Sequence, residues 1–141
     1  LLDGAHTVMS LTPDHRAIKE LGQKIGVAAL IAQDDEAPAL IGRSNREARA
    51  FARSAPAVPD AQLEVRAFAA SVGIEEDPVT GSLNASLAQW LIADGHLPDR
   101  YIAAQGDCID RAGRVHIERD AQGRVWVGGQ SVTCIDGSVT L

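Results

Sequence analysis

The apolar and polar positions at the start of the chain predict a strand, a helix and a second strand. Residues 7–11 (Thr-Val-Met-Ser-Leu) form a short β-prone run. After them, apolar residues recur at helical spacing, with Thr12 placed to cap the helix and Gly22 or Gly26 placed to end it. Residues 27–32 are a continuous apolar run of strand length.

The last part of the chain is predicted to be rich in strands. Residues 63–69 alternate apolar and polar side chains at first, as a half-buried strand does. Residues 114–118 and 125–127 flank an Asp-Ala-Gln-Gly turn, which predicts a hairpin. Two further strands are expected at residues 131–135 and 138–141.

Residues 33–62 have no clear hydrophobic period. Their acidic cluster at 34–36 is interpreted as a solvated turn rather than a metal site. The arginine-rich stretch at 43–53 fits either a short helix or an irregular surface segment.

Residues 83–93 differ from the amphipathic elements. Eight of these eleven residues are apolar, and they spread around most of the helical wheel. Such a helix is expected to be buried on most sides. Together with the strands, it predicts an α+β domain in which a curled mixed β-sheet wraps around a central apolar helix at about residues 83–94.

Composition and charge narrow the class of protein. The length of 141 residues fits one domain, and the net charge of −6 argues against nucleic acid or an anionic membrane as a partner. No apolar run approaches the roughly 20 residues of a membrane span, and no signal peptide pattern is found. Cys108 and Cys134 lack metal-ligand spacing, so we expect two buried, reduced thiols in a cytoplasmic protein. Because the chain opens on Leu1 rather than Met, we expect a piece of a longer protein.

The candidate chemistry lies between Glu75 and Ser82, just before the apolar helix. Pro78 stiffens the turn and holds Asp77 extended, and Gly81 allows close backbone approach to a ligand. The free N–H groups at the helix start can hold a carboxylate or a phosphate. A carboxylate such as Asp77 beside a bound anion is harder to keep charged, which suits it for proton transfer.

The residue spacing alone leaves a structural interpretation equally open. Thr80 or Ser82 would then be an ordinary helix cap, and the Glu75-Glu76-Asp77 trio would be solvated.

A family resemblance favours the functional interpretation. The run Glu-Asp-Pro-Val-Thr-Gly-Ser at residues 76–82 resembles the signature of the PhzF-like isomerases of phenazine biosynthesis. Arg66-Ala67-Phe68, Gln105-Gly106 with Arg111, and the closing hairpin at 125–129 match in order. The resemblance implies the second, C-terminal lobe of a two-lobed fold similar to diaminopimelate epimerase, with residues 1–141 as a single domain and the N-terminal lobe absent.

The resemblance also implies roles for individual residues. Asp77 would be catalytic, and Thr80, Gly81 and Ser82 would bind the carboxylate of a small substrate in the cleft between the lobes. No metal or organic cofactor is expected. The acid/base Glu would come from the first lobe, supplied by the same gene or a partner chain. The family's biosynthetic role and a cytoplasmic location are expected with it.

Some residues depart from the family pattern. Residue 83 is Leu where the family usually has Ala, and Ala112 stands where Pro often follows Arg111. The helix start has no cysteine, which argues against a thiol racemase. A second hypothesis is a non-catalytic binding or assembly module that uses the cleft face as an oligomer interface. Because an isolated lobe would expose that face, we expect a homo-oligomer, a dimer or larger.

Overall fold

The computed structural model describes residues 1–31 and 61–140, which form one mixed β-sheet with helices on both of its faces. The elements run in the order α1 (Ala5–Ser10), α2 (His15–Leu21), β1 (Ile25–Leu30), β2 (Ala61–Ala69), η1 (Ala70–Val72), β3 (Ile74–Asp77), α4 (Gly81–Ala93), β4 (Arg100–Gln105), η2 (Asp107–Ile109), β5 (Gly113–Arg119) and β6 (Val125–Gly128). The fold class is therefore α+β, as the sequence predicts.

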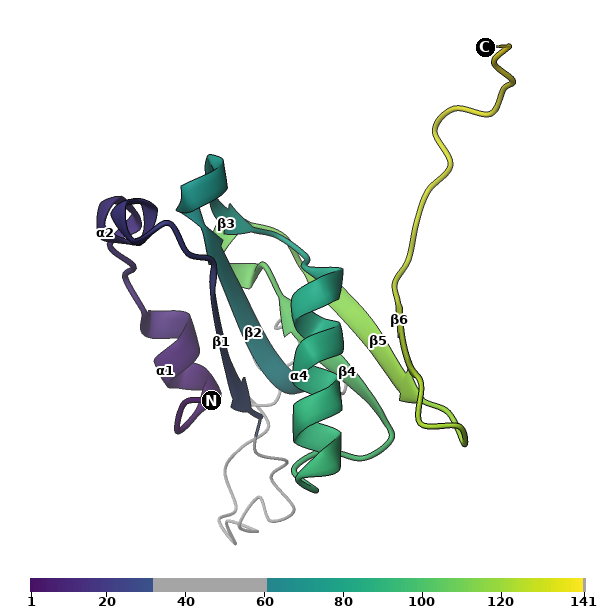
Figure 1. Cartoon of the computed structure of the whole chain (residues 1–141), viewed down its shortest axis with the longest axis horizontal. Helices are drawn as coiled ribbons and strands as arrows, with labels where there is room; N and C mark the ends of the chain where they lie inside the picture. The colour runs from purple at the N-terminus through teal and green to yellow at the C-terminus, as the bar shows by residue number, and fades with distance from the viewer. Residues whose placement is uncertain (32–60, 141) are drawn as a thin grey trace, which may run out of the picture.

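Strand β2 organises the sheet, whose strand order is β1-β2-β4-β5-β6 (Figure 1). It pairs antiparallel with β1 and parallel with β4. Its pairing with β4 reaches Val65 opposite Gln105, and from Ala67 onward β2 pairs instead with β3, with Ala67 opposite Asp77. The end of β4 and the end of β3 consequently meet beside the middle of β2.

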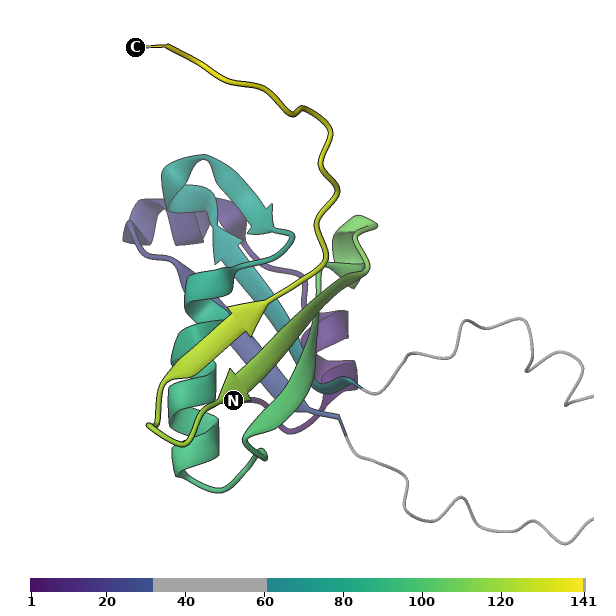
Figure 2. The same ribbon diagram turned by 90° about the vertical axis from the view of Figure 1, so that its right-hand side faces the viewer.

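Helix α4 covers one face of the sheet and forms the main core with it (Figure 2). Fully buried side chains of α4, β2, β4 and β5 meet there, among them Leu91, Leu63, Ala103 and Val115. The side of α4 that faces away from the sheet is exposed to solvent, as Gln89 and Trp90 show. The described residues thus cover one side of the helix, and a sheet that wraps fully around it stays a prediction.

Helices α1 and α2 lie on the other side of the sheet, beside β1 and β2 (Figure 1). Val8 of α1 is fully buried, and Ile18 of α2 packs in a small cluster with Phe68 and Ala70. Asp14 caps α2, since its carboxylate accepts a hydrogen bond from the Ala17 N–H at 2.9 Å. The prediction that Thr12 is the cap is therefore wrong, whereas Gly22 ends the helix in the left-handed conformation as expected.

The strand predicted at residues 7–11 is wrong, because α1 occupies Ala5–Ser10. The five residues are β-prone but offer one apolar side chain to bury deeply, Val8. As a helical turn this segment buries Val8 against the sheet, and tertiary packing of this kind overrides weak local propensity. The strands predicted at 27–32 and 63–69 are confirmed as β1 and β2, except that β1 ends at Leu30 and residue 32 lies outside the described residues.

The closing hairpin is confirmed as β5 and β6, but the strands predicted after it are wrong for the described residues. Residues 129–140 are extended, form no strand and are exposed (Figures 1 and 2). An extended segment needs a neighbouring strand for its backbone hydrogen bonds, and the described residues place none beside this one. The acidic cluster at 34–36 and the arginine-rich stretch at 43–53 lie outside the described residues.

Both cysteines are free thiols, but both are exposed, so the prediction of buried thiols is wrong. Cys108 lies on η2, where its Sγ is 3.8 Å from the Met9 Sδ. None of the described helices is both long enough and apolar enough to cross a membrane. In residues 1–31 and 61–140, no group of three or more acidic, His or Cys side chains is placed to hold a metal ion.

Candidate functional site

Asp77 is the last residue of β3 and lies at the entrance to α4. Its side chain is half-buried, and its Oδ2 accepts a hydrogen bond from the Thr80 hydroxyl at 2.7 Å. Thr80 occupies the N-cap position of α4, yet its side chain makes no capping bond. The hydroxyl is used to orient the Asp77 carboxylate, so the interpretation of Thr80 as an ordinary cap does not hold.

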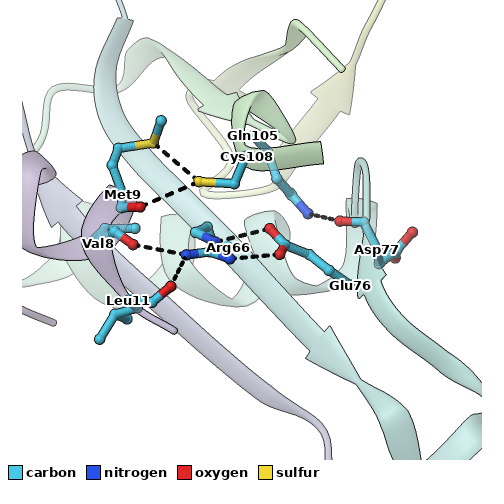
Figure 3. A network of polar contacts seen from close by, with 8 residues as sticks. All are labelled: Val8, Met9, Leu11, Arg66, Glu76, Asp77, Gln105 and Cys108. Atoms are coloured by element: carbon cyan, nitrogen blue, oxygen red, sulfur yellow. Dashed lines mark hydrogen bonds and ion pairs between the residues drawn. The ribbon is translucent and has the colours of Figure 1, made fainter. Parts of the chain in front are cut away.

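The Gln105 side chain holds the turn between β3 and α4 in place through four hydrogen bonds. The side chain is fully buried at the end of β4. Its Nε2 donates to the Asp77 carbonyl at 2.9 Å (Figure 3). The same Nε2 also donates to the Thr80 Oγ1 at 3.0 Å. Its Oε1 accepts from the Thr80 N–H at 3.1 Å and from the Asn84 Nδ2 at 2.9 Å. One amide group thereby connects the end of β3, the N-cap and the first turn of α4, and it fixes the position of the Asp77 backbone.

Two glycines allow the Pro78–Val79 turn to lie close to the end of β4. A Cβ at residue 106 would be 2.7 Å from the Pro78 carbonyl oxygen, and Gly106 also has a φ of +97°. A Cβ at residue 113 would be 2.6 Å from the Val79 Cγ2. Since real Cβ atoms do not approach so closely, both positions require glycine for this turn to keep its place.

The start of α4 presents hydrogen-bond donors beside Asp77. In the part of the chain that the structure describes, the Gly81 and Ser82 N–H groups have no acceptor, because the hydrogen bonds of α4 begin with the Asn84 N–H donating to the Thr80 carbonyl at 3.1 Å. Both residues are exposed. Free N–H groups together with the positive end of the helix dipole favour an anion at this point.

The Glu76 side chain is buried in an ion pair, so the interpretation that it is solvated is wrong. Its carboxylate forms two hydrogen bonds with the Arg66 guanidinium, at 2.9 and 2.7 Å, and both side chains are about 95% buried (Figure 3). The Arg66 Nη1 also donates to the carbonyls of Val8 and Leu11, at 3.2 and 2.8 Å. The hydrogen bond to Glu76 and its charge raise the pKa of Arg66. The ion pair holds β3, and so Asp77, against β2 and the end of α1.

Glu64 is a second buried acid, and it points to the opposite face of the sheet from α4. Register places it beside Ala29 of β1, and its Oε1 is buried without a hydrogen-bond partner among the described residues. Burial and the charge of Asp107 raise its pKa to about 7, against the lowering effect of Arg114 and Arg66. Its place on that face separates it from Asp77, so it does not supply a second carboxylate to the candidate site.

A cavity of about 290 Å³ opens next to Asp77, Thr80 and Ser82. It lies between α4, the strands β1 and β2, and the η1–β3 corner, and its walls include Ile25, Gly26, Phe68, Ile74 and Leu83. Lys24 lines it at the start of β1. A larger hollow of about 570 Å³ lies over β4, β5 and β6 and includes no predicted site residue. The volume of the smaller cavity is near the low end for ligand pockets, which suits a small metabolite.

The structure brings together the four residues predicted from the sequence: Asp77, Thr80, Gly81 and Ser82 lie in one turn, and three of them line the cavity. Sequence reasoning missed the positioning role of Gln105 and the part of Lys24 and Gly26 in the cavity wall. Gln105 carried a signal, since an amide at the end of a buried apolar strand needs partners in the interior. Lys24 and Gly26 carried none, because only the sheet brings them near α4.

Comparison with known proteins identifies the family of this chain. The profile of the phenazine biosynthesis-like protein family matches residues 2–137. The chain is 34% identical over 138 residues to an uncharacterized isomerase of Deinococcus radiodurans, covering 92% of this chain and 37% of that protein. It is 36% identical over 72 residues to an uncharacterized isomerase of Pasteurella multocida, covering 50% of this chain and 25% of that protein. The chain thus matches well under half the length of these relatives, and it belongs to the phenazine biosynthesis-like protein family.

Proposed function

We propose that this chain provides one half of the active site of an isomerase that shifts a proton on a small carboxylate-bearing metabolite. The observation that carries the proposal is the placement of the Asp77 carboxylate beside the free N–H groups that begin α4. An acid next to an anion site is the arrangement that proton transfer close to a carboxylate requires.

Each site residue has a role in this proposal. The Gly81 and Ser82 N–H groups bind the substrate carboxylate, aided by the dipole of α4. Thr80 orients Asp77 through their 2.7 Å hydrogen bond, and Asp77 faces the reacting carbon. Gln105 is a positioning residue, since it touches Asp77 and Thr80 but is itself fully buried. No cofactor enters the proposed chemistry.

A second lobe completes the proposed site. Moving a proton between two carbons calls for a group that accepts it and a group that returns it. Among the described residues, Glu64 and Glu76 are buried away from the cavity, and Glu75 is exposed on β3. We therefore propose that these 141 residues are the C-terminal lobe, that the acid/base Glu comes from an N-terminal lobe, and that the substrate lies in the cleft between them. The greater length of the relatives supports this arrangement.

The test is Asp77→Ala in the complete two-lobed protein. We expect turnover to fall by about 10²-fold or more, since a positioned acid or base contributes typically 10²- to 10⁴-fold. Glu75→Gln is the matched control, because Glu75 is an exposed acid on the same strand and should leave turnover unchanged. Equal turnover and equal ligand affinity in the Asp77→Ala protein and the wild type would overturn the proposal.

A second candidate function is a non-catalytic binding or assembly module whose cleft face is an oligomer interface. The observation in its favour is the apolar rim of the site, where Val72, Ile74 and Val79 are about half exposed. Such a patch suits either an apolar part of a substrate or a protein partner. The Asp77→Ala experiment separates the two, because an interface needs the apolar rim but not the carboxylate.

A further inference from the structure

The wall of the cavity beside Asp77 contains an unusual contact between α4 and β1. Leu83, in the first turn of α4, lies directly over Gly26 of β1. A Cβ added at Gly26 would be 2.5 and 2.8 Å from the two Leu83 methyl carbons. The Leu83 side chain therefore occupies the space that a side chain at residue 26 would fill, and both residues line the cavity.

The cavity is polar at one end and largely apolar along the rest of its length. Asp77, Thr80 and Ser82 lie at one end, where α4 begins. From there the cavity follows α4 to Ser86, one helical turn beyond Ser82. The remaining lining is largely apolar and comes from β1, β2 and the η1–β3 corner, including Ala67 and Ile74. A carboxylate held at the helix start would thus have its carbon chain directed along Leu83.

We propose that Leu83, seated on Gly26, sets the length of the apolar chain that the substrate carboxylate can carry, so that this pair determines specificity. The inference rests on the proposed function, because it assumes that the carboxylate binds at the N–H groups of Gly81 and Ser82. It assigns the substrate class as a carboxylate with a short apolar chain, matching a cavity of about 290 Å³.

Substitutions at the two positions should act in opposite directions. Leu83→Ala removes three carbons from the wall and lengthens the cavity. Gly26→Ala adds a carbon that the flexible end of Leu83 must avoid. Because Leu83 also lines the cavity, we expect its side chain to move into that space. The backbone φ of Gly26 lies outside the left-handed region, so alanine is tolerated there. The double variant Gly26→Ala/Leu83→Ala should return towards the wild-type length preference.

The experiment measures binding of straight-chain carboxylates from acetate to octanoate to the complete protein, by nuclear magnetic resonance titration. Each additional buried methylene strengthens binding by about fourfold, which corresponds to about 0.8 kcal/mol. In the wild type this gain should stop at a short chain. In Leu83→Ala it should continue for two to three further carbons, and in Gly26→Ala it should stop earlier. Leu87→Ala is the matched control, because Leu87 is partly buried one turn further along α4 and does not line the cavity.

The outcomes separate this inference from the proposed function. If carboxylates bind and Leu83→Ala has the same chain-length profile as Leu87→Ala, the inference is wrong and the proposed function stands. Hexanol is included because it shares the apolar chain but lacks the charge. If hexanol binds as well as hexanoate, or if no carboxylate binds to the wild type, the proposed carboxylate site is wrong and the inference is overturned with it.

Discussion

At the scale of single residues, Glu64 shows how burial changes the chemistry of one side chain. The residue is 5% exposed, and its Oε1 has no hydrogen-bond partner among the described residues. Burial first, and the Asp107 charge second, raise the pKa of Glu64 from 4.5 to about 7. The folded protein therefore holds this proton at pH values where the unfolded chain has already released it.

This difference predicts a pH dependence of stability. Between about pH 4.5 and 7 the folded state binds more protons than the unfolded state, so the free energy of unfolding falls as the pH rises. A pKa raised from 4.5 to about 7 corresponds to a loss of about 3 kcal/mol across that window. Glu64→Gln cannot ionise and should lack this loss, as urea unfolding at several pH values would measure.

Glu75→Gln serves as the control, because Glu75 is exposed on β3 and should keep the wild-type pH dependence. Parallel pH profiles for the wild type and Glu64→Gln would show that Glu64 ionises in the folded protein at its ordinary pKa.

Some features of the candidate site could be predicted from the sequence and others could not. The Asp77–Ser82 turn was predictable, because proline, glycine and hydroxyl residues before an apolar helix have direct backbone consequences. The burial of Glu76 was not, since its partner Arg66 is ten positions away and becomes a neighbour only when β3 pairs with β2. Register across the sheet decides which acids are solvated and which are buried.

At the scale of elements, the Arg66–Glu76 pair connects three segments. Arg66 lies on β2, Glu76 on β3, and the carbonyls that Arg66 binds belong to the end of α1. This connection helps to explain why residues 7–11, predicted as a strand, belong largely to helix α1. Two carbonyls at the end of this short helix accept hydrogen bonds from a buried guanidinium. Local sequence at residues 7–11 contains no information about that partner.

Breaking the pair should destabilise the fold and loosen β3. Glu76→Gln leaves the buried Arg66 charge without its counter-ion, which costs about 3 kcal/mol in the free energy of unfolding. Amide hydrogen exchange at residues 74–77 should accelerate as well, because β3 is attached to β2 by this contact and a short ladder. Chemical denaturation gives the first quantity, and exchange followed by mass spectrometry gives the second.

The chain offers a matched comparison in Arg16 and Glu20. These residues also form an ion pair, but their side chains are 90% and 68% exposed. Glu20→Gln should change the free energy of unfolding by less than about 0.5 kcal/mol, since an exposed helical pair gains little. Similar losses for Glu20→Gln and Glu76→Gln would argue that burial does not govern the strength of the Arg66–Glu76 pair.

For the described fold taken together, two groups of three exposed apolar side chains bear on how the chain associates. Val72, Ile74 and Val79 surround the candidate site and are 47–56% exposed. Val132, Ile135 and Val139 follow β6 and are 81–91% exposed. The sequence predicted strands at the second group, but the described residues provide no strand for it to pair with.

These two surfaces lead to a prediction about association. We expect the 141-residue chain to form a dimer or larger species whose mass rises with concentration in light scattering. If the site face is the interface, as the assembly hypothesis holds, then serine at positions 72, 74 and 79 should weaken association by at least about a hundredfold. The reason is that each buried Val or Ile side chain contributes about 1.5 kcal/mol.

Serine at positions 132, 135 and 139 is the matched variant, since it also replaces one isoleucine and two valines. Under the assembly hypothesis this variant keeps the wild-type mass. If it dissociates while the site-face variant does not, residues 129–140 form the contact and the site face is left for a ligand and the proposed second lobe. A monomer at every concentration would contradict both interfaces. Either of the last two results would favour the enzyme hypothesis, because the apolar rim of Asp77 would then have no protein partner among copies of this chain.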